Sequence, residues 1–565
     1  MSLNSNRNGS IDTPKTRYIC VTGGVISGLG KGVVASAIGR ILKSRGYTVT
    51  GVKIDPYINM DAGTMRPTEH GEVFVTYDGG ETDQDLGNYE RFLDEELSRN
   101  NSITTGQVYA KVIADERDLK YEGKCVEVIP HIPMEVQSRI EKCAKEKNAD
   151  FVIIEVGGTI GDYQNVLFIE ALKKMYLEGK PVVFVHLVYL LVPHNLGEMK
   201  TKPAQHSVRQ LNELGIFPDF VICRSEKPMD EVRKQKISLF CNVRQDEIIS
   251  AHDLETIYEE PLLFEEQGLG DKILAKFEIK NPPKSQLEDW KKMVHQIKAA
   301  ERTVNIGIVG KYFDSGNFTL EDSYVSVIEA IKHAAFRENH KPKIHWIDAK
   351  QFEPKTAALE TLSHFDGIIV PGGFGASGVE GKINAIEYCR ENKIPYLGLC
   401  YGMQLAVVEY GRHVAGMSDA HSTEINPNTT YPVIDILPEQ RKLIEQNKYG
   451  NTMRLGNYTA NLKKGTLVHK LYGQDKIVER HRHRFEVNRF YEDALEKAGL
   501  VISGKNTEAD LVEFIELANH PFFVGTQSHP EFKSRPLSPH PLFLGFVKAA
   551  IEKQHETANQ KSALR

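Results

Sequence analysis

A cysteine, a histidine and a glutamate in the C-terminal half have the types and spacing of a nucleophile and its base. Cys400 follows the apolar run Ile394 to Leu399 and has glycine two residues before and two residues after it. Small residues there permit a sharp strand-to-helix turn that exposes a nucleophile at a helix N-terminus, where the dipole favours a thiolate. A buried structural cysteine is the plainer interpretation, and the flanking glycines argue against it. His529 and Glu531 lie two residues apart in extended chain, so Glu531 can orient His529 as the base.

Two further patterns fit the binding of an amino-acid amide beside this cysteine. A glycine turn follows the apolar run Ile368 to Pro371, and the backbone N–H groups of Gly373 and Tyr401 can form an oxyanion hole. Glu424 and Arg484 can pair with the ammonium and carboxylate of a free amino acid. The pattern predicts release of ammonia from glutamine. The predicted glutamine-binding residues are Gly373, Tyr401, Gly402, Met403, Gln404, Glu424 and Arg484.

A glycine-rich loop near the N-terminus has the order of a phosphate-binding site. The apolar run Ile19 to Thr22 leads into the loop Gly23 to Gly30, then Lys31, then a helical pattern over 33–45. Loop N–H groups, the helix dipole and the lysine can all hold phosphate. Gly32 stands where the standard loop has a hydroxyl for Mg²⁺, and the glycine spacing is one residue longer. An isolated loop of this kind is as often a plain tight turn, and its metal ligands must come from elsewhere.

Two acids and a basic cluster complete the candidate phosphate-binding site in the N-terminal half. Asp85 and Glu155 are placed where an α/β sheet puts its ligands, beyond the carboxyl ends of strands, and Mg²⁺ prefers carboxylates together with phosphate oxygens. The segment Lys200 to Gln205 and Lys236 on a later helix suit a polyphosphate. Two lysines beside a proline are most often an exposed turn, so the basic cluster is a weak signal.

Both candidate sites lie in regions that alternate short apolar strands, glycine turns and amphipathic helices. This alternation predicts an α/β fold class with two domains on mainly parallel sheets, an N-terminal P-loop-like domain and a C-terminal domain carrying Cys400. The stretch Asn281 to Ser285 and the polar residues after it are typical of a linker. We predict a disordered tail over 1–16, a first domain over 17–280, a linker over 281–302, a second domain over 303–552 and a disordered tail over 553–565.

Length and composition exclude several protein classes. The chain has 565 residues, 41% hydrophobic and 26% charged, which is the composition of a globular protein too long for one core. A formal net charge of -6 gives no nucleic-acid footprint. Seven cysteines without a CxxC pair argue against disulfides or a zinc site. No apolar run has the length of a membrane helix, and the polar N-terminus lacks a signal-peptide core. We therefore expect a cytoplasmic protein without membrane or nucleic-acid partners.

Longer stretches resemble the CTP synthase family, in which an amidoligase (synthetase) domain is fused to a class I, or triad, glutamine amidotransferase domain. The likeness covers about residues 17 to 550. Its most distinctive stretches are Lys53 to Asn59, His70 to Val75, Gly157 to Thr159 and Glu479 to Arg484. Long runs of this kind are far more specific than a single short motif.

The resemblance implies a ligase that makes CTP from UTP, the last committed step of de novo CTP synthesis. ATP with Mg²⁺ would phosphorylate O4 of UTP, and Lys31 and Lys53 would stabilise the transferred group. Ammonia would pass a gate at His70 and Val73 and replace the phosphate at C4. The family also implies a homotetramer that GTP activates and CTP inhibits. The implied ATP-binding residues are Ser27, Gly28, Leu29, Gly30, Lys31, Gly32 and Asp85; the metal ligands are Asp85 and Glu155; and the UTP and CTP residues are Ser27, Asp162, Tyr163, Gln164, Lys200, Thr201, Lys202, Pro203, Ala204, Gln205 and Lys236.

The chain departs from the family pattern at several positions. Gln164 stands where many members have a glutamate that contacts inhibitory CTP, and Ser377 stands where many have an arginine implicated in GTP activation. The segment 187–196 differs in sequence and length, Ala204 replaces a frequent threonine, and Tyr401 replaces a frequent leucine. None of these changes removes a proposed catalytic group. Regulation by CTP and GTP is what they put in question.

Two other functions stay open. An ATP-dependent amidotransferase of the cobyrinic acid a,c-diamide synthase type would have a similar phosphate loop and a carboxylate acceptor. A structural or filament-forming protein that has lost catalysis is the second alternative. The intact residues Lys31, Asp85, Glu155, Cys400 and His529 argue against it.

We expect inhibition of this chain by CTP to be weaker than is usual in the family or to be built differently, because Gln164 lacks the carboxylate that many members present at this position. A CTP titration of the UTP-dependent reaction measures the effect. Inhibition at the ordinary sensitivity of the family would contradict the expectation.

Overall fold

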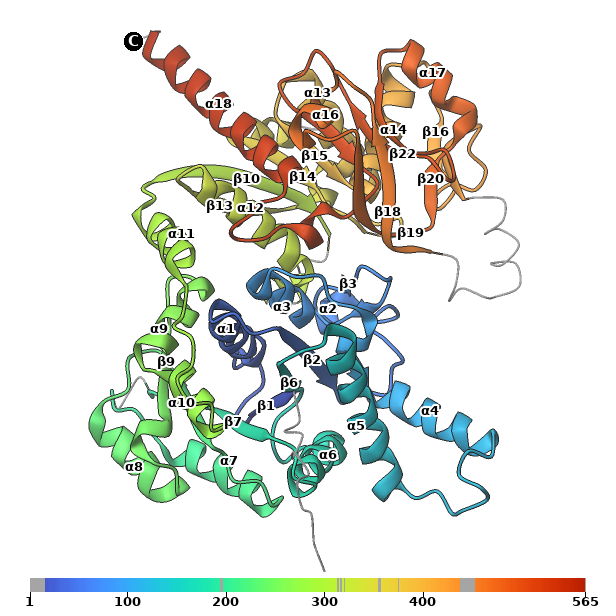
Figure 1. The fold of residues 1–565 in the computed structure, drawn as a ribbon. Helices are drawn as coiled ribbons and strands as arrows, with labels where there is room; N and C mark the ends of the chain where they lie inside the picture. Colours follow the sequence, from blue (N-terminus) through green and yellow to red (C-terminus); the bar gives the residue numbers. More distant parts are fainter. Residues whose placement is uncertain are drawn as a thin grey trace, which may run out of the picture. The chain divides into compact units, whose positions relative to one another are not determined.

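The structure is a computed structural model that describes residues 16–193, 197–311, 314–315, 318–319, 321–353, 357–373, 375–436 and 453–563. The chain divides into two compact units, coloured along the sequence in Figure 1. The first unit comprises Met1–Asp61 and Asn88–Glu288, and the second comprises Ala62–Gly87 and Asp289–Arg565. The predicted tail over 1–16 lies almost entirely outside the described residues.

The first unit is built on a seven-stranded sheet in which every neighbouring pair of strands is parallel. Its order is β5-β2-β6-β1-β7-β8-β9. The strands are β1 (Arg17–Gly23), β2 (Val49–Asp55), β5 (Ser102–Thr104), β6 (Phe151–Val156), β7 (Val182–Tyr189), β8 (Phe220–Ser225) and β9 (Ile248–His252). Apolar, mainly β-branched runs form these strands because both faces of a parallel sheet are buried.

Helices cover both faces of this first sheet, as Figure 1 shows for α1 (Lys31–Ser44) and for α5 (Val128–Lys147) and α6 (Val166–Leu177). Tyr18 and Cys20 belong to the same buried cluster as apolar residues of α5 and α6. Ile153 faces the other way, towards Gly39 of α1. Towards β9 the sheet packs on α7 (Lys202–Glu213) and α8 (Glu231–Cys241).

The second unit is built on a nine-stranded sheet that is half parallel and half antiparallel. Its order is β13-β10-β14-β15-β23-β22-β21-β18-β19. The first five strands pair in parallel and the pairs from β23 to β19 are antiparallel. The strands are β10 (Arg302–Gly310), β13 (His340–Asp348), β14 (Gly367–Val370), β15 (Tyr396–Leu399), β18 (Arg454–Leu462), β19 (Lys476–His483), β21 (Val501–Asn506), β22 (Leu511–Glu516) and β23 (Phe523–Thr526).

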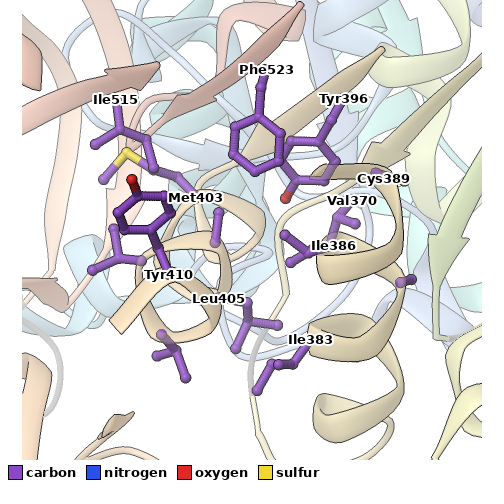
Figure 2. Close-up of a cluster of buried hydrophobic side chains, with 14 of the residues drawn as sticks. Val370, Ile383, Ile386, Cys389, Tyr396, Met403, Leu405, Tyr410, Ile515 and Phe523 are labelled. Atoms are coloured by element: carbon purple, nitrogen blue, oxygen red, sulfur yellow. The ribbon is translucent and has the colours of Figure 1, made fainter. Parts of the chain in front are cut away.

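Two buried clusters hold the second sheet between helices. Figure 2 shows part of the cluster under α13 (Val379–Glu391) and α14 (Tyr401–His413), where Tyr396 stacks on Phe523 with ring centroids 4.6 Å apart. On the other face, α12 (Val325–Arg337) and α18 (Pro541–Ala563) pack on apolar residues of β10, β15 and β23. The carboxyl ends of β14, β15 and β23 are thereby held side by side.

The segment Ala62–Gly87 belongs to the second unit although it precedes most of the first unit in sequence. It contains α2 (Pro67–His70) and the short strands β3 (Phe74–Val75) and β4 (Glu81–Thr82), which pair antiparallel. The prediction had placed the whole range 17–280 in one domain. Local strand and helix patterns carry no signal for this long-range association.

Two other boundaries differ from the predicted ones. The predicted linker over 281–302 contains the helix α11 (Glu288–Ala299), whose Trp290 is 1% exposed. The C-terminal residues from 553, predicted as a disordered tail, continue α18 as far as Ala563, so the structure corrects that boundary. No helix among the described residues has both the length and the apolar character to cross a membrane. All seven cysteines are free thiols.

Candidate active site

Cys400 sits at the turn between β15 and α14 with a strained backbone. Its φ of 49° and ψ of −98° lie in a region of backbone conformation that residues other than glycine rarely adopt. Gly402 is required because a Cβ there would come within 2.1 Å of the Val370 carbonyl oxygen, and one at Gly398 would be 2.6 Å from the Tyr396 hydroxyl. The Cys400 N–H donates to the Thr526 carbonyl at 2.7 Å. The sequence pattern of two flanking glycines thus has a steric cause.

His529 follows the end of β23, the strand beside β15. Its backbone N–H donates to the Arg480 carbonyl of β19 at 2.7 Å, and its Nδ1 lies 2.6 Å from Oε1 of Glu531. Burial opposes a charge on this ring, but Glu531 and then Cys400 outweigh burial and raise the pKa of His529 to about 10. The imidazole is therefore held protonated between a carboxylate and a sulfur at neutral pH.

Gly372 shows how closely the glycine turn after β14 approaches these side chains. A Cβ on Gly372 would lie 2.8 Å from Cε1 of His529 and 3.7 Å from Cβ of Cys400. Any larger residue at this position would displace the histidine. The structure therefore brings together the cysteine, the histidine and the glycine turn that the sequence predicted from three separate stretches.

A cavity of about 230 Å³ opens over this cluster within the second unit. Its wall includes Gly373, Cys400, Arg484 and His529, and also Glu72 and Val73 of the segment Ala62–Gly87. Val73 is one of the two predicted gate residues. The other, His70, is not part of this wall; its Nδ1 lies 3.5 Å from Asp83.

Strand β19 holds the segment Ala62–Gly87 against the cavity. Arg480 donates to the Val75 carbonyl at 3.1 Å, and Arg482 donates to Glu81 at 2.8 Å. The Glu72 carboxylate accepts from the backbone N–H and the hydroxyl of Ser326. These anchors were not predicted as site residues, because the partners lie hundreds of positions apart in sequence and no local pattern pairs them.

Aromatic contacts extend the same anchoring to the histidine. Phe74 of β3 meets Phe532 edge to face with ring centroids 5.0 Å apart, and Phe532 stacks on His529 with centroids 5.3 Å apart. The orientation of the His529 ring therefore depends on packing as well as on Glu531.

The predicted glutamine-binding residues fall into two groups. Gly373 and Arg484 face the cavity, and Glu424 accepts from the Gly375 N–H at 2.9 Å, with burial as the main cause of its raised pKa. Met403 is different: its side chain is fully buried in the core drawn in Figure 2. The predicted contact of Met403 with glutamine would therefore use its backbone.

Three neighbours at the start of α14 have internal partners. The Tyr401 hydroxyl donates to the Gly375 carbonyl at 3.2 Å, and the Gly402 carbonyl accepts from Tyr396 at 2.9 Å. The Gln404 amide donates to the Phe485 carbonyl at 2.8 Å. A position next to a nucleophile in sequence therefore does not by itself put a side chain in the cavity.

In the first unit, the predicted phosphate loop has the backbone of an anion cradle. Val25, Gly28 and Gly30 have φ of 80°, 72° and 82°, and α1 begins at Lys31. The Lys31 ammonium donates to the Gly158 carbonyl at 2.9 Å. Ser27 and Gly28 are exposed, so the loop is open to a ligand.

Behind this loop lies a buried cluster of one lysine and two acids. The Lys53 ammonium is 3.3 Å from Glu155 and 3.7 Å from Asp55, and Tyr89 donates to Glu155. Glu155 lies inside β6, where it pairs with Val21 of β1, rather than beyond the strand end as predicted. Asp85, the other predicted metal ligand, begins α3 (Asp85–Leu93) and belongs to the second unit. Among the described residues, no group of three or more His, Cys, Asp or Glu side chains is arranged to hold a metal ion.

A buried histidine links the phosphate loop to the basic cluster. His186 of β7 is 2.9 Å from the Thr22 hydroxyl at the end of β1 and 2.8 Å from the Ser207 hydroxyl in α7. Burial, with the charge of Lys31 as a smaller cause, lowers the pKa of His186 to about 3. The neutral ring thus fixes the strand before the loop against the helix that starts at Lys202.

Most of the predicted UTP and CTP residues surround the start of α7 or lie in exposed chain. Lys200 pairs with Glu198 at 2.7 Å, Gln205 donates to the Thr201 hydroxyl at 3.1 Å, and Pro203 occupies the first turn of α7. Asp162, Gln164, Lys202 and Lys236 are exposed, as is Tyr163 at 97%. Ala204 is fully buried in the core. A contact of Ala204 with a nucleotide, if formed as predicted, would therefore use its backbone.

A small cavity of about 60 Å³ adjoins the phosphate loop and was not predicted. Leu29, Gly30 and Val33 form one side, and Arg224 and Glu260 lie on the other. Burial raises the pKa of Glu260 to about 7, opposed by the charge of Arg224. These two residues are more than 190 positions after the loop, so no local motif joins them to it.

Comparison with known families divides the chain at a similar place. Residues 17–279 match the sequence model of the CTP synthase N-terminus, and residues 319–549 match that of class I glutamine amidotransferases. The glutaminase domain of Trypanosoma brucei CTPS, solved with bound acivicin, is 39% identical. The match covers 44% of this chain and 94% of that one, with a TM-score of 0.41.

Full-length relatives match nearly the whole chain. The CTP synthase of Pyrococcus furiosus is 53% identical over 544 residues, which is 96% of this chain and 99% of the relative. The CTP synthase of Thermus thermophilus is 49% identical over 556 residues, which is 97% of this chain and 99% of the relative.

Replacing Glu531 by glutamine should destabilise the protein in a pH-dependent way. A histidine whose pKa is raised from 6.5 to about 10 contributes its full stabilisation below pH 6.5 and loses it as the pH rises through 10. We expect Glu531→Gln to lower the free energy of unfolding by about 3 kcal/mol at pH 6 and by much less at pH 10. Denaturation at the two pH values measures the difference in free energy of unfolding between wild type and variant. The exposed Glu508→Gln is the control. A difference that stays the same at pH 6 and pH 10 would contradict this account.

Replacing His186 by leucine should leave the Thr22 and Ser207 hydroxyls buried without their ring partner. We expect a loss of about 2 kcal/mol or more in the free energy of unfolding, because each buried polar group left unsatisfied costs roughly 1 to 3 kcal/mol. Urea denaturation measures it. His206→Leu, at an exposed neighbour of Ser207, should have little effect; equal losses in both variants would refute the role of His186.

Proposed function

The chain belongs to the CTP synthase family, and on that premise we propose that it converts UTP to CTP with ATP as phosphoryl donor and glutamine as the source of ammonia. One observation carries the proposal: a strained cysteine turn with His529 and Glu531 occurs in the same chain as a phosphate loop that ends in Lys31. The first arrangement suits amide hydrolysis and the second suits phosphoryl transfer. The reaction makes the chain a carbon–nitrogen ligase of pyrimidine biosynthesis.

Glutamine hydrolysis begins at Cys400. Its thiolate attacks the side-chain amide carbon of glutamine, and the carbonyl electrons move onto oxygen to give a tetrahedral oxyanion. The backbone N–H groups of Gly373 and Tyr401 stabilise this oxyanion. His529 gives its proton to the amide nitrogen, the carbon–nitrogen bond breaks, and ammonia leaves behind a thioester. The raised pKa of His529, held up by Glu531 and Cys400 against burial, supports this role as proton donor.

A water molecule then releases glutamate. His529, now neutral, takes a proton from the water as its oxygen attacks the thioester carbon. The carbon–sulfur bond breaks, and the electron pair returns to Cys400 as the thiolate. The protonated histidine and the thiolate restore the starting state.

The amino-acid part of glutamine is held by groups of opposite charge. Arg484 in the cavity wall supports binding of the carboxylate, and the partly buried Glu424 supports binding of the ammonium. The backbone around Gly402, Met403 and Gln404 completes the proposed contacts. Ammonia leaves the cavity past Val73, with His70 as the second proposed gate residue.

In the synthetase half, O4 of UTP attacks the γ-phosphorus of ATP as N3 of the uracil ring loses its proton, the bond to the β-phosphate oxygen breaks, and ADP leaves. Ammonia then attacks C4, phosphate departs with the C4–O4 bonding electrons, and the nitrogen loses a proton. The loop from Ser27 to Gly32 binds the ATP phosphates, and Lys31 and Lys53 stabilise the transferred charge. The proposed UTP and CTP contacts are Ser27, Asp162, Tyr163, Gln164, Lys200, Thr201, Lys202, Pro203, the backbone of Ala204, Gln205 and Lys236.

A magnesium ion fits the chemistry of this half. Glu155 is a buried carboxylate on the strand next to β1, and Gly32 gives the loop no hydroxyl ligand of its own. Glu155 would hold the ion, and Asp85 stays the second predicted ligand. When bound, the ion supplies charge neutralisation for the ATP phosphates.

We extend the proposal to regulation and assembly because the family resemblance implies them. GTP acts as an activator, with Ser377 as the position that weakens its effect. The chain assembles as a homotetramer in the cytoplasm. These statements rest on the family alone.

Replacing Cys400 by alanine should separate the two half-reactions. Glutamine-dependent formation of CTP from UTP, followed spectrophotometrically with ATP, Mg²⁺ and GTP, should fall at least about a thousandfold, since the nucleophile is gone. Ammonia-dependent formation should survive. Cys125→Ala, at an exposed thiol, should change neither.

Two results would overturn the assignment. The wild-type chain failing to convert UTP under these conditions would exclude CTP synthesis and favour a carboxylate acceptor. Loss of both activities in Cys400→Ala would mean that the two halves do not work separably.

A further inference from the structure

Lys382 is a buried lysine that no role described above uses. It lies on α13 with 0% exposure, and its ammonium has no hydrogen-bond partner among the described residues. The ammonium lies 5.3 Å from the centre of the Tyr401 ring. A lysine on an ordinary helix surface would extend into solvent, so this position needs an explanation.

The ammonium of Lys382 lies close to both segments proposed to form the oxyanion hole. A Cβ on Gly373 would be 4.0 Å from Nζ of Lys382, and Tyr401 directly follows the nucleophile. Helix α13 is fixed at this place, because a Cβ on Gly381 would come within 1.8 Å of the Ala349 carbonyl oxygen. The lysine is therefore held next to the turn, and it is not one of the residues that line the cavity.

Burying this amine works against the stability of the fold. Burial, followed by the charge of Lys311, lowers the pKa of Lys382 to about 7. An apolar side chain of the same length would fill the space without that desolvation cost. The face of the Tyr401 ring offers partial compensation, since a cation is attracted to an aromatic face. A buried ionisable residue that lowers stability close to an active site is a candidate for a role in catalysis.

We propose that Lys382 is a positioning residue for glutamine hydrolysis, whose buried charge acts through the Gly373 turn and Tyr401 to stabilise the oxyanion that forms after attack by Cys400. It touches neither glutamine nor the reacting atoms. The inference rests on the proposed glutaminase function of Cys400. A charge fixed in a water-poor interior costs no reorganisation when the negative charge develops, which makes even an indirect contribution effective.

The other charged groups around this position define its electrostatics. Lys311, at the end of β10, is the one whose charge lowers the pKa of Lys382. Glu424 lies across the turn on the Gly375 N–H, and Tyr401 presents its ring from α14. On α13 itself, Glu380 is paired with Arg412. Lys382 is charged below pH 7 and loses its charge as the pH rises through 7, so its effect on catalysis must fade over the same range.

Lys382→Met tests the proposal, because methionine keeps the length of the side chain and removes the charge. We expect kcat for glutamine-dependent CTP formation to fall about tenfold at pH 6, less than the loss of a direct oxyanion donor. The KM for glutamine should stay unchanged, and so should the ammonia-dependent activity. The ratio of wild-type to variant kcat should decline towards one as the pH rises from 6 to 8.5. Lys350→Met, at an exposed lysine next to α13, is the matched control.

Stability and a second variant distinguish this role from a structural one. Lys382→Met should unfold at the same or a higher temperature than wild type, because it removes a buried charge that has no hydrogen-bond partner among the described residues. Lys382→Arg stays charged at every pH tested. Its glutamine-dependent kcat should therefore be the same at pH 8.5 as the charged lysine would support, whereas wild type has lost its lysine charge at pH 8.5.

Several outcomes would overturn the inference. A kcat ratio that is independent of pH, an unchanged kcat in Lys382→Met, or a variant that fails to fold would each assign Lys382 to structure alone. Wild-type protein without glutamine-dependent activity would instead overturn the proposed function itself.

Discussion

The backbone at Cys400 is the constraint on which the rest of the second unit depends. A positive φ in a residue with a side chain costs of order 1–3 kcal/mol and persists only where the surroundings fix it. The surroundings here are specific: Gly402 packs on the Val370 carbonyl, and the Cys400 N–H is bound to Thr526. Both partners lie on strands beside β15. The strained turn therefore exists only once β14, β15 and β23 are paired. The position of the nucleophile thus depends on the assembled sheet.

The same strand pairing fixes the base. Because β15 and β23 are parallel neighbours, their carboxyl ends deliver Cys400 and His529 to one place. Strand β19 adds a second constraint, since the Arg480 carbonyl holds the His529 N–H while its side chain holds Val75 of the segment Ala62–Gly87. The alternate residues of β19 point into a different environment, where Arg454 bridges Glu486 and Glu513 beside His481 and His483. Burial lowers the pKa of both histidines well below the usual value, so they stay neutral and the buried charges of this network stay few.

Local patterns predicted the parts of the site that depend on local geometry. The glycines around Cys400 and the two-residue spacing of His529 and Glu531 encode a turn and a hydrogen bond within a few residues. Met403 and Ala204 show where that reasoning ends, because proximity in sequence to a motif does not determine which face of a helix is buried. The association of the segment Ala62–Gly87 with the second unit could not be predicted, since its anchors Arg480 and Ser326 lie hundreds of residues away. Lys382 was missed for a similar reason: a single lysine in a helical pattern indicates a solvated surface.

The two halves differ in how a lysine can serve a negative charge. In the first unit, Lys31 stands at a helix start beside an open loop, and its ammonium donates to a backbone carbonyl. A phosphate brings its full charge before reaction, so the loop and the lysine beside it can bind that charge in the ground state. An oxyanion exists only during the reaction, and a group that had to move towards it would act too late. Charge that serves such a state must already be in place and out of water, and Lys382 is buried close to the Gly373 turn in this way. Burying the Lys382 amine lowers the stability of the fold for this reason. The two buried apolar clusters on either face of the nine-stranded sheet offset that loss.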